Sequence, residues 1–194
     1  MLIDLESIGT QAIGRIGELI VEMELLAKGW QVGNFNASTA NSAGWDVFAA
    51  GFGRSLKIRV KTKRPGTGCF RWSAKSDGSI LAGLCEGDGS DIVAAVDLLS
   101  AEGEYAVYLV PSVAVEGELR GTYDRWVSAP KADGSPRKAT SMRNLYIDED
   151  VDRLSHGYAI KWAEYRDAWD GLKSMSDAPQ KSGLSAARQT DLTV

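Results

Sequence analysis

Residues 55–63 carry the pattern that most restricts how this chain can fold. Apolar and cationic side chains alternate there without a break for four periods. Because successive side chains of a β-strand point to opposite faces of a sheet, this pattern predicts a strand with one buried face and one charged face. The buried face would consist of Leu56, Ile58, Val60 and Thr62, and the charged face of Lys57, Arg59, Lys61 and Lys63.

The rest of the chain predicts an α/β fold around this strand. A helix is expected over about 6–29, where Ile16, Leu19, Ile20, Met23, Leu26 and Ala27 recur at three- and four-residue spacing. A second helix is expected over 158–172, where Trp162, Tyr165 and Trp169 recur in the same way. Short runs with strand character predict further strands at 30–35, 44–50, 69–72, 91–99, 104–111 and 144–147. We therefore expect one domain over 1–174, with a central mixed sheet flanked by the N-terminal and C-terminal helices.

Two segments do not fit this pattern. Residues 117–143 are polar and rich in Gly, Pro, Lys and Arg, which predicts a long basic loop. Residues 175–194 are polar and small without a period, which predicts a disordered tail. The basic residues of the loop are Arg120, Arg125, Lys131, Arg137, Lys138 and Arg143.

The distribution of charge indicates a local cationic patch. The formal net charge of −4 argues against nucleic acid as a partner, because Lys and Arg drive phosphate binding. However, residues 54–75 contain eight basic residues and no acid. An ordinary solvated face is the alternative interpretation of this run. Its members are Arg54, Lys57, Arg59, Lys61, Lys63, Arg64, Arg71 and Lys75.

Other sequence features exclude some classes of protein. No run approaches the ~20 apolar residues of a membrane-spanning helix, and the N-terminus carries acids where a signal peptide carries bases. We therefore expect a cytoplasmic protein. Cys69 and Cys85 lie far apart, and His156 is the single histidine, so a zinc site is not expected.

Three side chains in three different elements are candidates for a catalytic site. On the first helix, Glu18 shares a face with Glu22 away from the main apolar stripe, so it could enter a crevice; an exposed carboxylate is the alternative. Asp46 lies in the middle of the predicted strand 44–50, where Asp is disfavoured and a divalent cation would compensate its charge. An Asp at the sheet surface is the alternative. Lys61 of the next strand could lie beside Asp46. Carboxylates that hold Mg²⁺, together with a lysine that positions or deprotonates water, are the groups that phosphodiester hydrolysis needs.

The order of these features resembles the PD-(D/E)XK, or restriction-endonuclease-like, nuclease superfamily. The resemblance rests on the helix sequence GRIGELIVEMELLAKGW, then W-D-V, then I-R-V-K-T-K about a dozen residues later. Within the superfamily, the chain is most similar to intron homing endonucleases and archaeal Holliday junction resolvases. The resemblance covers residues 12–116. It implies a restriction-endonuclease-like core in which Glu18 and Asp46 bind Mg²⁺ or Mn²⁺ and Lys61 acts on water.

One position departs from the family pattern. Where the family has Glu or Gln two residues before the lysine, this chain has Arg59. A guanidinium has no acceptor atom, so it cannot bind Mg²⁺ and would repel it. Glu22, one helical turn beyond Glu18, could replace the missing ligand while Arg59 binds a DNA phosphate. The strand register also leaves open that Lys63 or Lys57, in place of Lys61, lies nearest to Asp46.

The sequence therefore supports three hypotheses about function. The first is a Mg²⁺-dependent DNA endonuclease, with Glu18, Asp46 and Lys61 as catalytic residues and a DNA-binding surface. A homodimer is an open alternative, because nucleases that cut both strands are often dimers. The second is a catalytically silent relative that binds DNA or a protein partner. The third is a structural domain whose similarity is coincidental. The DNA-binding surface would consist of Arg59, Lys57, Lys63, Arg64, Arg71 and Lys75.

Overall fold

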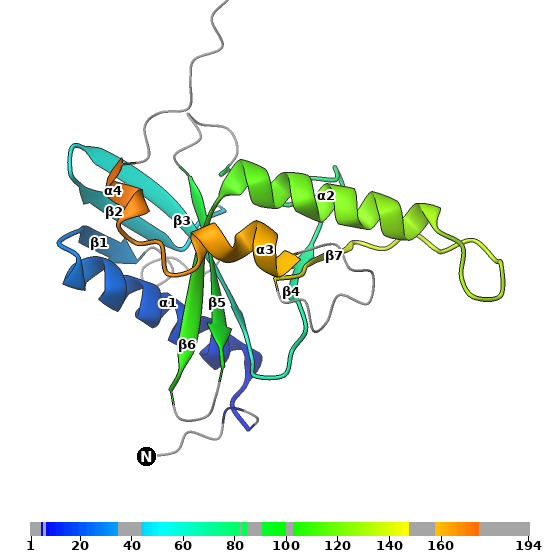
Figure 1. Ribbon diagram of the computed structural model, residues 1–194, viewed down its shortest axis with the longest axis horizontal. Coiled ribbons are helices and arrows are strands. Elements are labelled where there is room, and N and C mark those ends of the chain that lie inside the picture. Colours follow the sequence, from blue (N-terminus) through cyan, green and yellow to red (C-terminus); the bar gives the residue numbers. More distant parts are fainter. Residues whose placement is uncertain are drawn as a thin grey trace, which may run out of the picture.

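The computed structural model describes residues 5, 7–34, 44–81, 83–84, 91–99, 103–147 and 158–174. A five-stranded sheet with the order β1-β2-β3-β5-β6 lies at its centre (Figure 1). Strands β3 and β5 run parallel, and the other three neighbouring pairs are antiparallel. The predicted α/β fold with a central mixed sheet is therefore confirmed. Its helices and strands are α1 (Thr10–Ala27), β1 (Gln31–Asn34), β2 (Val47–Gly51), β3 (Arg54–Lys63), β4 (Phe70–Ser73), β5 (Ile92–Leu98), β6 (Tyr105–Pro111), α2 (Ser112–Ser128), β7 (Met142–Leu145), α3 (Tyr158–Trp162) and α4 (Gly171–Ser174).

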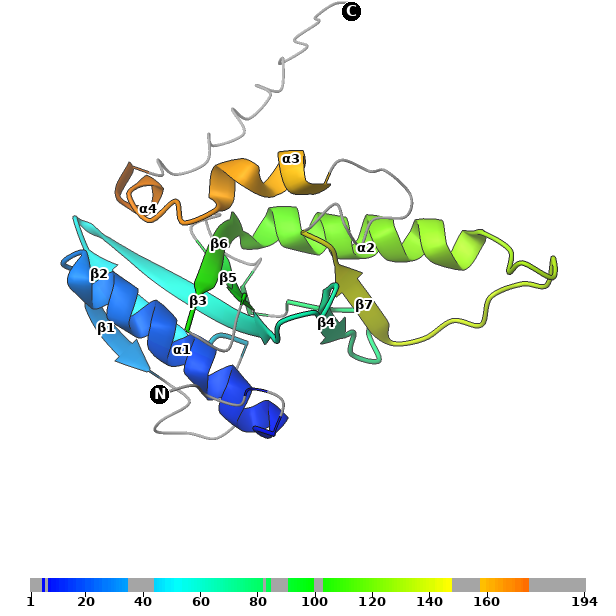
Figure 2. The same cartoon turned by 60° about the horizontal axis from the view of Figure 1, so that its bottom comes forward.

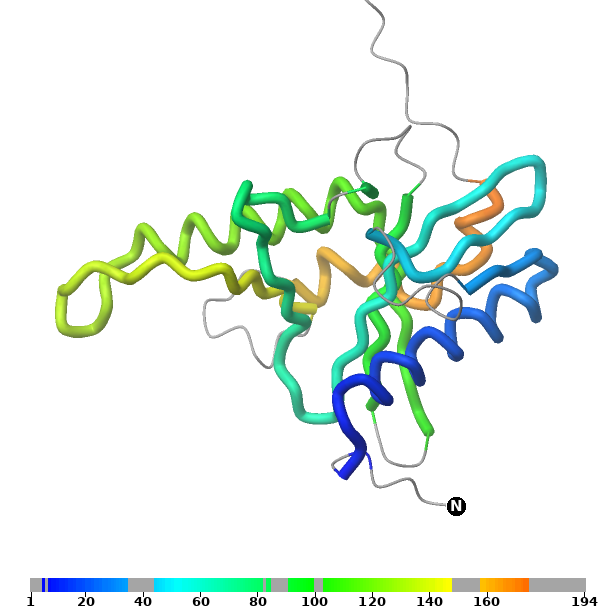
Figure 3. The backbone as a smooth tube through the Cα atoms, turned by 180° about the vertical axis from the view of Figure 1, so that it is seen from behind, coloured from blue at the N-terminus to red at the C-terminus, as the bar shows by residue number. Residues whose placement is uncertain are grey.

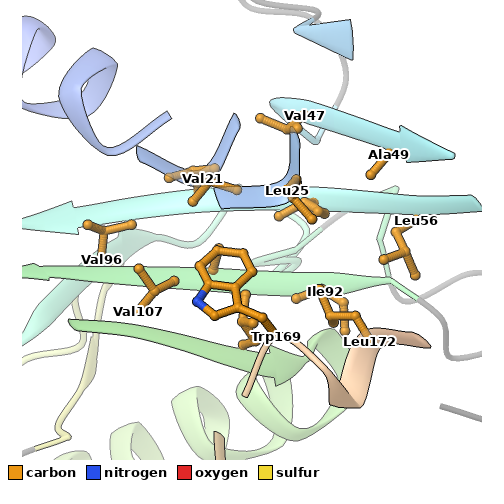
Figure 4. Close-up of a cluster of buried hydrophobic side chains, with 14 of the residues drawn as sticks. Val21, Leu25, Val47, Ala49, Leu56, Ile92, Val96, Val107, Trp169 and Leu172 are labelled. Carbon is orange, nitrogen blue, oxygen red and sulfur yellow. The ribbon is translucent and has the colours of Figure 1, made fainter. Parts of the chain in front are cut away.

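Strand β3 has the two-faced character that its alternation predicts. Leu56, Ile58 and Val60 are buried in an apolar cluster that includes residues of α1 (Figure 4). The opposite face of the sheet therefore carries the side chains of Lys57, Arg59, Lys61 and Lys63. Because β3 pairs with β2 on one side and with β5 on the other, this cationic row lies in the middle of the sheet.

Helix α1 buries a stripe that differs from the predicted one. Its buried residues are spaced by four, and three residues of the predicted stripe are 48–58% exposed. The cause is Gly17: a Cβ there would lie 1.9 Å from Oγ1 of Thr62 on β3. The absent side chain allows close contact between helix and strand, so packing at Gly17 sets the buried face of the helix. The buried residues are Ile13, Gly17, Val21 and Leu25, and the exposed ones are Leu19, Met23 and Leu26.

Residues 117–143 were expected to form a loop, and the first part of this segment is helical instead. Helix α2 extends to Ser128. Gly117 and Gly121 weaken the helical signal in the sequence, because glycine is among the poorest helix formers. Tertiary packing overrides this preference, since Val115 and Leu119 are fully buried against the face of the sheet opposite α1. The predicted strands near 69–72 and 144–147 are present as β4 and β7, which form a separate two-stranded sheet next to α2 (Figure 2).

The predicted continuous helix over 158–172 is interrupted. After α3, a 3-10 turn over Ala163–Tyr165 leads to Arg166, which bridges Tyr108 of β6. Asp167, with φ of 51°, donates its N–H to Val107 O at 2.7 Å and accepts the Val107 N–H at 2.9 Å. These bonds satisfy backbone groups at the edge of the sheet, and a continuous helix could not make them. The aromatic residues Trp162 and Trp169 are buried on the domain as predicted.

Several predictions concern residues outside the described part of the chain. These are Cys85, His156 and the tail 175–194. The single-domain boundary at 174 stays a prediction. Among the described helices, none has the length and apolar character needed to cross a membrane.

Candidate phosphodiester site

Asp46 lies immediately before β2, and not within a strand as predicted. Its backbone N–H donates to Ile58 O at 2.9 Å, and its Oδ2 accepts the Val60 N–H at 2.8 Å. Both bonds join Asp46 to β3, so the carboxylate takes the place of a backbone carbonyl at the end of the β2-β3 pair. The residue is only 4% exposed. A buried carboxylate of this kind requires a counter-charge as well as hydrogen bonds.

Arg59 supplies that counter-charge. Its Nη1 lies 3.3 Å from Asp46 Oδ1, and its side chain is 36% exposed. As expected from two-residue spacing on one strand, Arg59 and Lys61 share a face of β3. A cation at the position where the family has a metal-coordinating Glu or Gln thus contacts the candidate metal ligand.

Lys61 belongs to the same group of charges. Its Nζ lies 5.6 Å from the centre of the Trp72 ring of β4, which helps to shield the ammonium from water. Burial lowers the pKa of Lys61, the positive charge of Arg59 lowers it further, and Asp46 acts in the opposite direction. An amine with a lowered pKa is more easily neutral, which is the form that can accept a proton from water.

Glu18 and Glu22 form a second group with two residues that the sequence analysis did not single out. Arg15 Nη1 donates to Glu18 Oε2 at 2.9 Å and to Glu22 Oε1 at 2.8 Å. The Asn34 side-chain amide, at the end of β1, donates to the same two oxygens at 3.3 and 2.5 Å. The position of Arg15, three residues before Glu18 and seven before Glu22, was a signal for this contact. No local signal indicated Asn34, because tertiary packing brings β1 beside α1.

The two groups of contacts belong to different faces of the sheet. Asn34 pairs with Val47, which lies in the apolar cluster beneath α1, so the Glu18 and Glu22 group belongs to the α1 side. Arg59 points away from that side, and it holds Asp46. The structure therefore brings Asp46, Arg59 and Lys61 together and joins Glu18 to Glu22. That Glu18 and Asp46 bind one metal ion stays a prediction.

The other predicted DNA-binding residues differ in accessibility. Arg71 and Lys75 are exposed, and Lys57 is half-buried on the polar face of β3. Arg64 donates to the backbone carbonyl of Ile8. Lys63 is 7% exposed, and its Nζ lies 2.7 Å from Asp97 Oδ2, so a phosphate contact by Lys63 would have to break a buried ion pair.

The carboxylates of the candidate site are of the chemical type that binds a divalent cation. Carboxylate oxygens are the ligands that Mg²⁺ and Mn²⁺ prefer, and Asp46, Glu18 and Glu22 provide them. Arg59 contacts Asp46, whereas the two glutamates contact Arg15 and Asn34. The ion would therefore have to displace Arg59 from Asp46. Within the described ranges, no three His, Cys, Asp or Glu side chains are grouped closely enough to hold a metal ion.

Comparisons with known proteins add a likeness of fold. The chain is similar to a bacterial homing endonuclease, I-Ssp6803I, with 18% sequence identity and a TM-score of 0.44 over 86% of this chain and 92% of that chain. It is also similar to MepB, with 9% identity and a TM-score of 0.31 over 77% of this chain and 95% of that chain. At these values the likeness carries no argument about function. No protein-family model matches the chain, and no curated protein sequence matches it.

Proposed function

We propose that this protein is a metal-dependent DNA endonuclease that hydrolyses phosphodiester bonds at the polar face of β3. The observation that supports this proposal is the grouping of Asp46, Arg59 and Lys61 on that face. A buried carboxylate, a guanidinium and an amine with a lowered pKa are the groups needed to hold a metal ion, bind a phosphate and act on water.

Each residue would have a separate role in the reaction. Asp46 would hold Mg²⁺ or Mn²⁺ on this face. Glu18, with Glu22 as a further candidate, belongs to the α1 side and would have to leave Arg15 and Asn34 to join the same ion. When bound, the ion would polarise the phosphate and lower the pKa of the attacking water. Lys61 would position this water or accept its proton. Arg59 would leave Asp46 for a non-bridging phosphate oxygen, with which a guanidinium forms paired hydrogen bonds.

The surrounding charge favours DNA as the substrate. The acid-free run of residues 54–75 includes the exposed Arg71 and Lys75 and the half-buried Lys57. These side chains could hold the phosphate backbone without reading its sequence. The overall charge of −4 opposes this attraction elsewhere on the protein, so binding should depend on the local patch.

A second candidate function is favoured by the contact between Arg59 and Asp46. The same carboxylate that would bind a metal already accepts the Val60 N–H and neutralises Arg59. A protein that has lost hydrolysis could keep this arrangement for stability and bind DNA or a protein partner through the same face.

Cleavage assays distinguish the two functions. Linear, supercoiled and branched DNA would be incubated with the protein and Mg²⁺ or Mn²⁺. We expect cleavage by the wild type and its loss in Asp46→Asn and Lys61→Ala. Asp46→Asn is the preferred variant, because an amide oxygen can still accept the Val60 N–H, and thermal unfolding verifies that each variant folds. Equal cleavage by wild type and Asp46→Asn would reject the proposed site. Absence of cleavage with all substrates, together with retained DNA binding, would favour the second function.

A further inference from the structure

The C-terminal half of α2 and the chain that connects it to β7, residues 121–143, extend away from the central sheet (Figures 1 and 3). We refer to this segment as the arm. The arm contains residues 121–128 of α2, which at ~1.5 Å per residue are about 12 Å of helix, and the connection that follows them. An arm of this length could reach a partner that extends well beyond the face of β3.

The end of the arm is cationic although the whole chain is acidic. Residues 129–143 contain four basic residues and one acid, whereas the chain has a net charge of −4. The acid, Asp133, accepts both the backbone N–H and the hydroxyl of Ser135 in a turn. Within the described residues, none of the four bases forms an ion pair. They are Lys131, Arg137, Lys138 and Arg143.

Two basic residues within α2 itself do form ion pairs. Arg120 pairs with Glu116 at 2.5 Å, and Arg125 pairs with Glu118 at 3.2 Å. Their charges are offset locally, so the cationic surface is confined to the chain after α2. Removing a paired charge such as that of Arg120 therefore serves as a control for removing an unpaired charge at the end of the arm.

Aromatic side chains lie directly beneath two of these cations. The Arg143 guanidinium is 3.3 Å from the centre of the Tyr123 ring, and the Arg137 guanidinium is 5.2 Å from the centre of the Trp126 ring. Trp126 is 41% exposed, which is unusual for so large an apolar side chain.

Further bonds hold the connection in one shape on α2. Tyr123 Oη accepts the Thr140 N–H at 3.2 Å, and Arg137 Nε donates to Ala129 O at 3.0 Å. The two arginines are thus already arranged, and binding a partner would not have to order them.

We propose that the arm is a second DNA-contacting surface that grips the phosphate backbone of the duplex outside the β3 site. The proposal rests on the proposed function, since it assigns the arm to the same DNA. Exposed cations without acidic partners bind phosphates by releasing counterions, and they do so independently of sequence. Because the arm extends away from the sheet that carries the β3 site (Figures 1 and 3), a duplex that covers only that site should not contact the arm.

Binding to duplexes of two lengths tests the proposal. Fluorescence anisotropy would measure affinity for duplexes of about 10 and about 30 base pairs, with a chelator present to prevent cleavage. The variant Lys131→Gln/Lys138→Gln removes two exposed charges. The control Arg120→Gln/Lys173→Gln removes two charges that have acidic partners and lie outside the cationic end of the arm.

We expect the arm variant to bind the longer duplex more weakly than wild type, with the salt dependence of log K reduced by about two. Its affinity for the shorter duplex and the behaviour of the control should match wild type. Equal loss in the control, or an arm variant that binds the long duplex as wild type does, would overturn the proposal. Wild-type protein that binds neither duplex would also overturn it and would point to an acidic protein as the partner. A Lys61→Ala variant that keeps wild-type affinity for both duplexes, while the arm variant loses affinity for the long one, would reject the proposed β3 site and support DNA binding by the arm.

Discussion

Replacing Arg59 with Gln should strengthen metal binding by this protein. The substitution removes the guanidinium that lies 3.3 Å from Asp46 Oδ1 and introduces the residue that the family pattern has at this position. Glutamine also has an acceptor oxygen, whereas arginine has none. The variant should therefore free Asp46 and add a donor at the same time.

The size of the effect follows from the geometry of the ion pair. An ion about 2.1 Å from Asp46 Oδ1 would lie about 5 Å from the guanidinium nitrogen. At an effective dielectric constant of about 20, the repulsion between one and two positive charges at this distance is about 6 kcal/mol. Because the Arg59 side chain is 36% exposed and can turn into solvent, we halve this value. The remaining ~3 kcal/mol corresponds to about a hundredfold lower Kd for the metal in Arg59→Gln.

Calorimetric titration with Mn²⁺ or Mg²⁺ measures this Kd directly. Arg59→Lys is the matched control, because it keeps the positive charge and should bind metal as weakly as wild type. Thermal unfolding with and without the ion gives a second reading, since a ligand that binds the folded state raises the Tm. An Arg59→Gln protein that is folded and binds metal no better than Arg59→Lys would refute the reasoning that Arg59 blocks the site.

Three further predictions concern packing and charge. Gly17→Ala should lower the free energy of unfolding by about 1–3 kcal/mol through overpacking. Gly14→Ala should raise the free energy of unfolding by about 0.5–1 kcal/mol, because a Cβ there would meet nothing within 4 Å. Urea denaturation of the two variants measures both changes. Lys63→Met leaves Asp97 buried without its partner and should cost about 3–5 kcal/mol in the same assay, and the double variant Lys63→Met/Asp97→Leu should recover most of the loss. Lys61→Met should raise the Tm at pH 7, because the folded state lowers the pKa of Lys61 below 10.5 and the charged lysine therefore destabilises it. The difference in Tm between variant and wild type should shrink as the pH rises from the folded pKa of Lys61 to 10.5. A difference in Tm that stays constant up to pH 10.5 would contradict this prediction.

The cationic row on β3 could be predicted because it depends on local periodicity. Alternation with a period of two defines which residues share a face, whatever the rest of the fold does. Arg59 and Lys61 were therefore assigned to one face before the structure was known. Strands β5 and β6 were predicted from short apolar, β-branched runs instead, and all of β5 and the interior residues of β6 are buried.

The errors occurred where packing between distant segments outweighs the local pattern. The buried stripe of α1 depends on contact between Gly17 and Thr62, which are far apart in the sequence. Helix α2 is stabilised by burial of Val115 and Leu119 against the sheet despite its two glycines. The predicted C-terminal helix ends at Trp162, and the chain after it bonds to the edge of β6 through Asp167.

The sequence by itself determined which side chains share a face of each strand, because the covalent geometry of the backbone points successive side chains to opposite faces. It identified the carboxylates, the lysine and the unusual arginine that a phosphodiester site would use. Which of them touch was decided by the tertiary structure alone, because the Asp46 contact with Arg59 and the Asn34 contact with Glu22 each join elements that only folding brings together. The cationic arm belongs to the same category, since its form depends on α2 packing against a sheet that lies elsewhere in the chain.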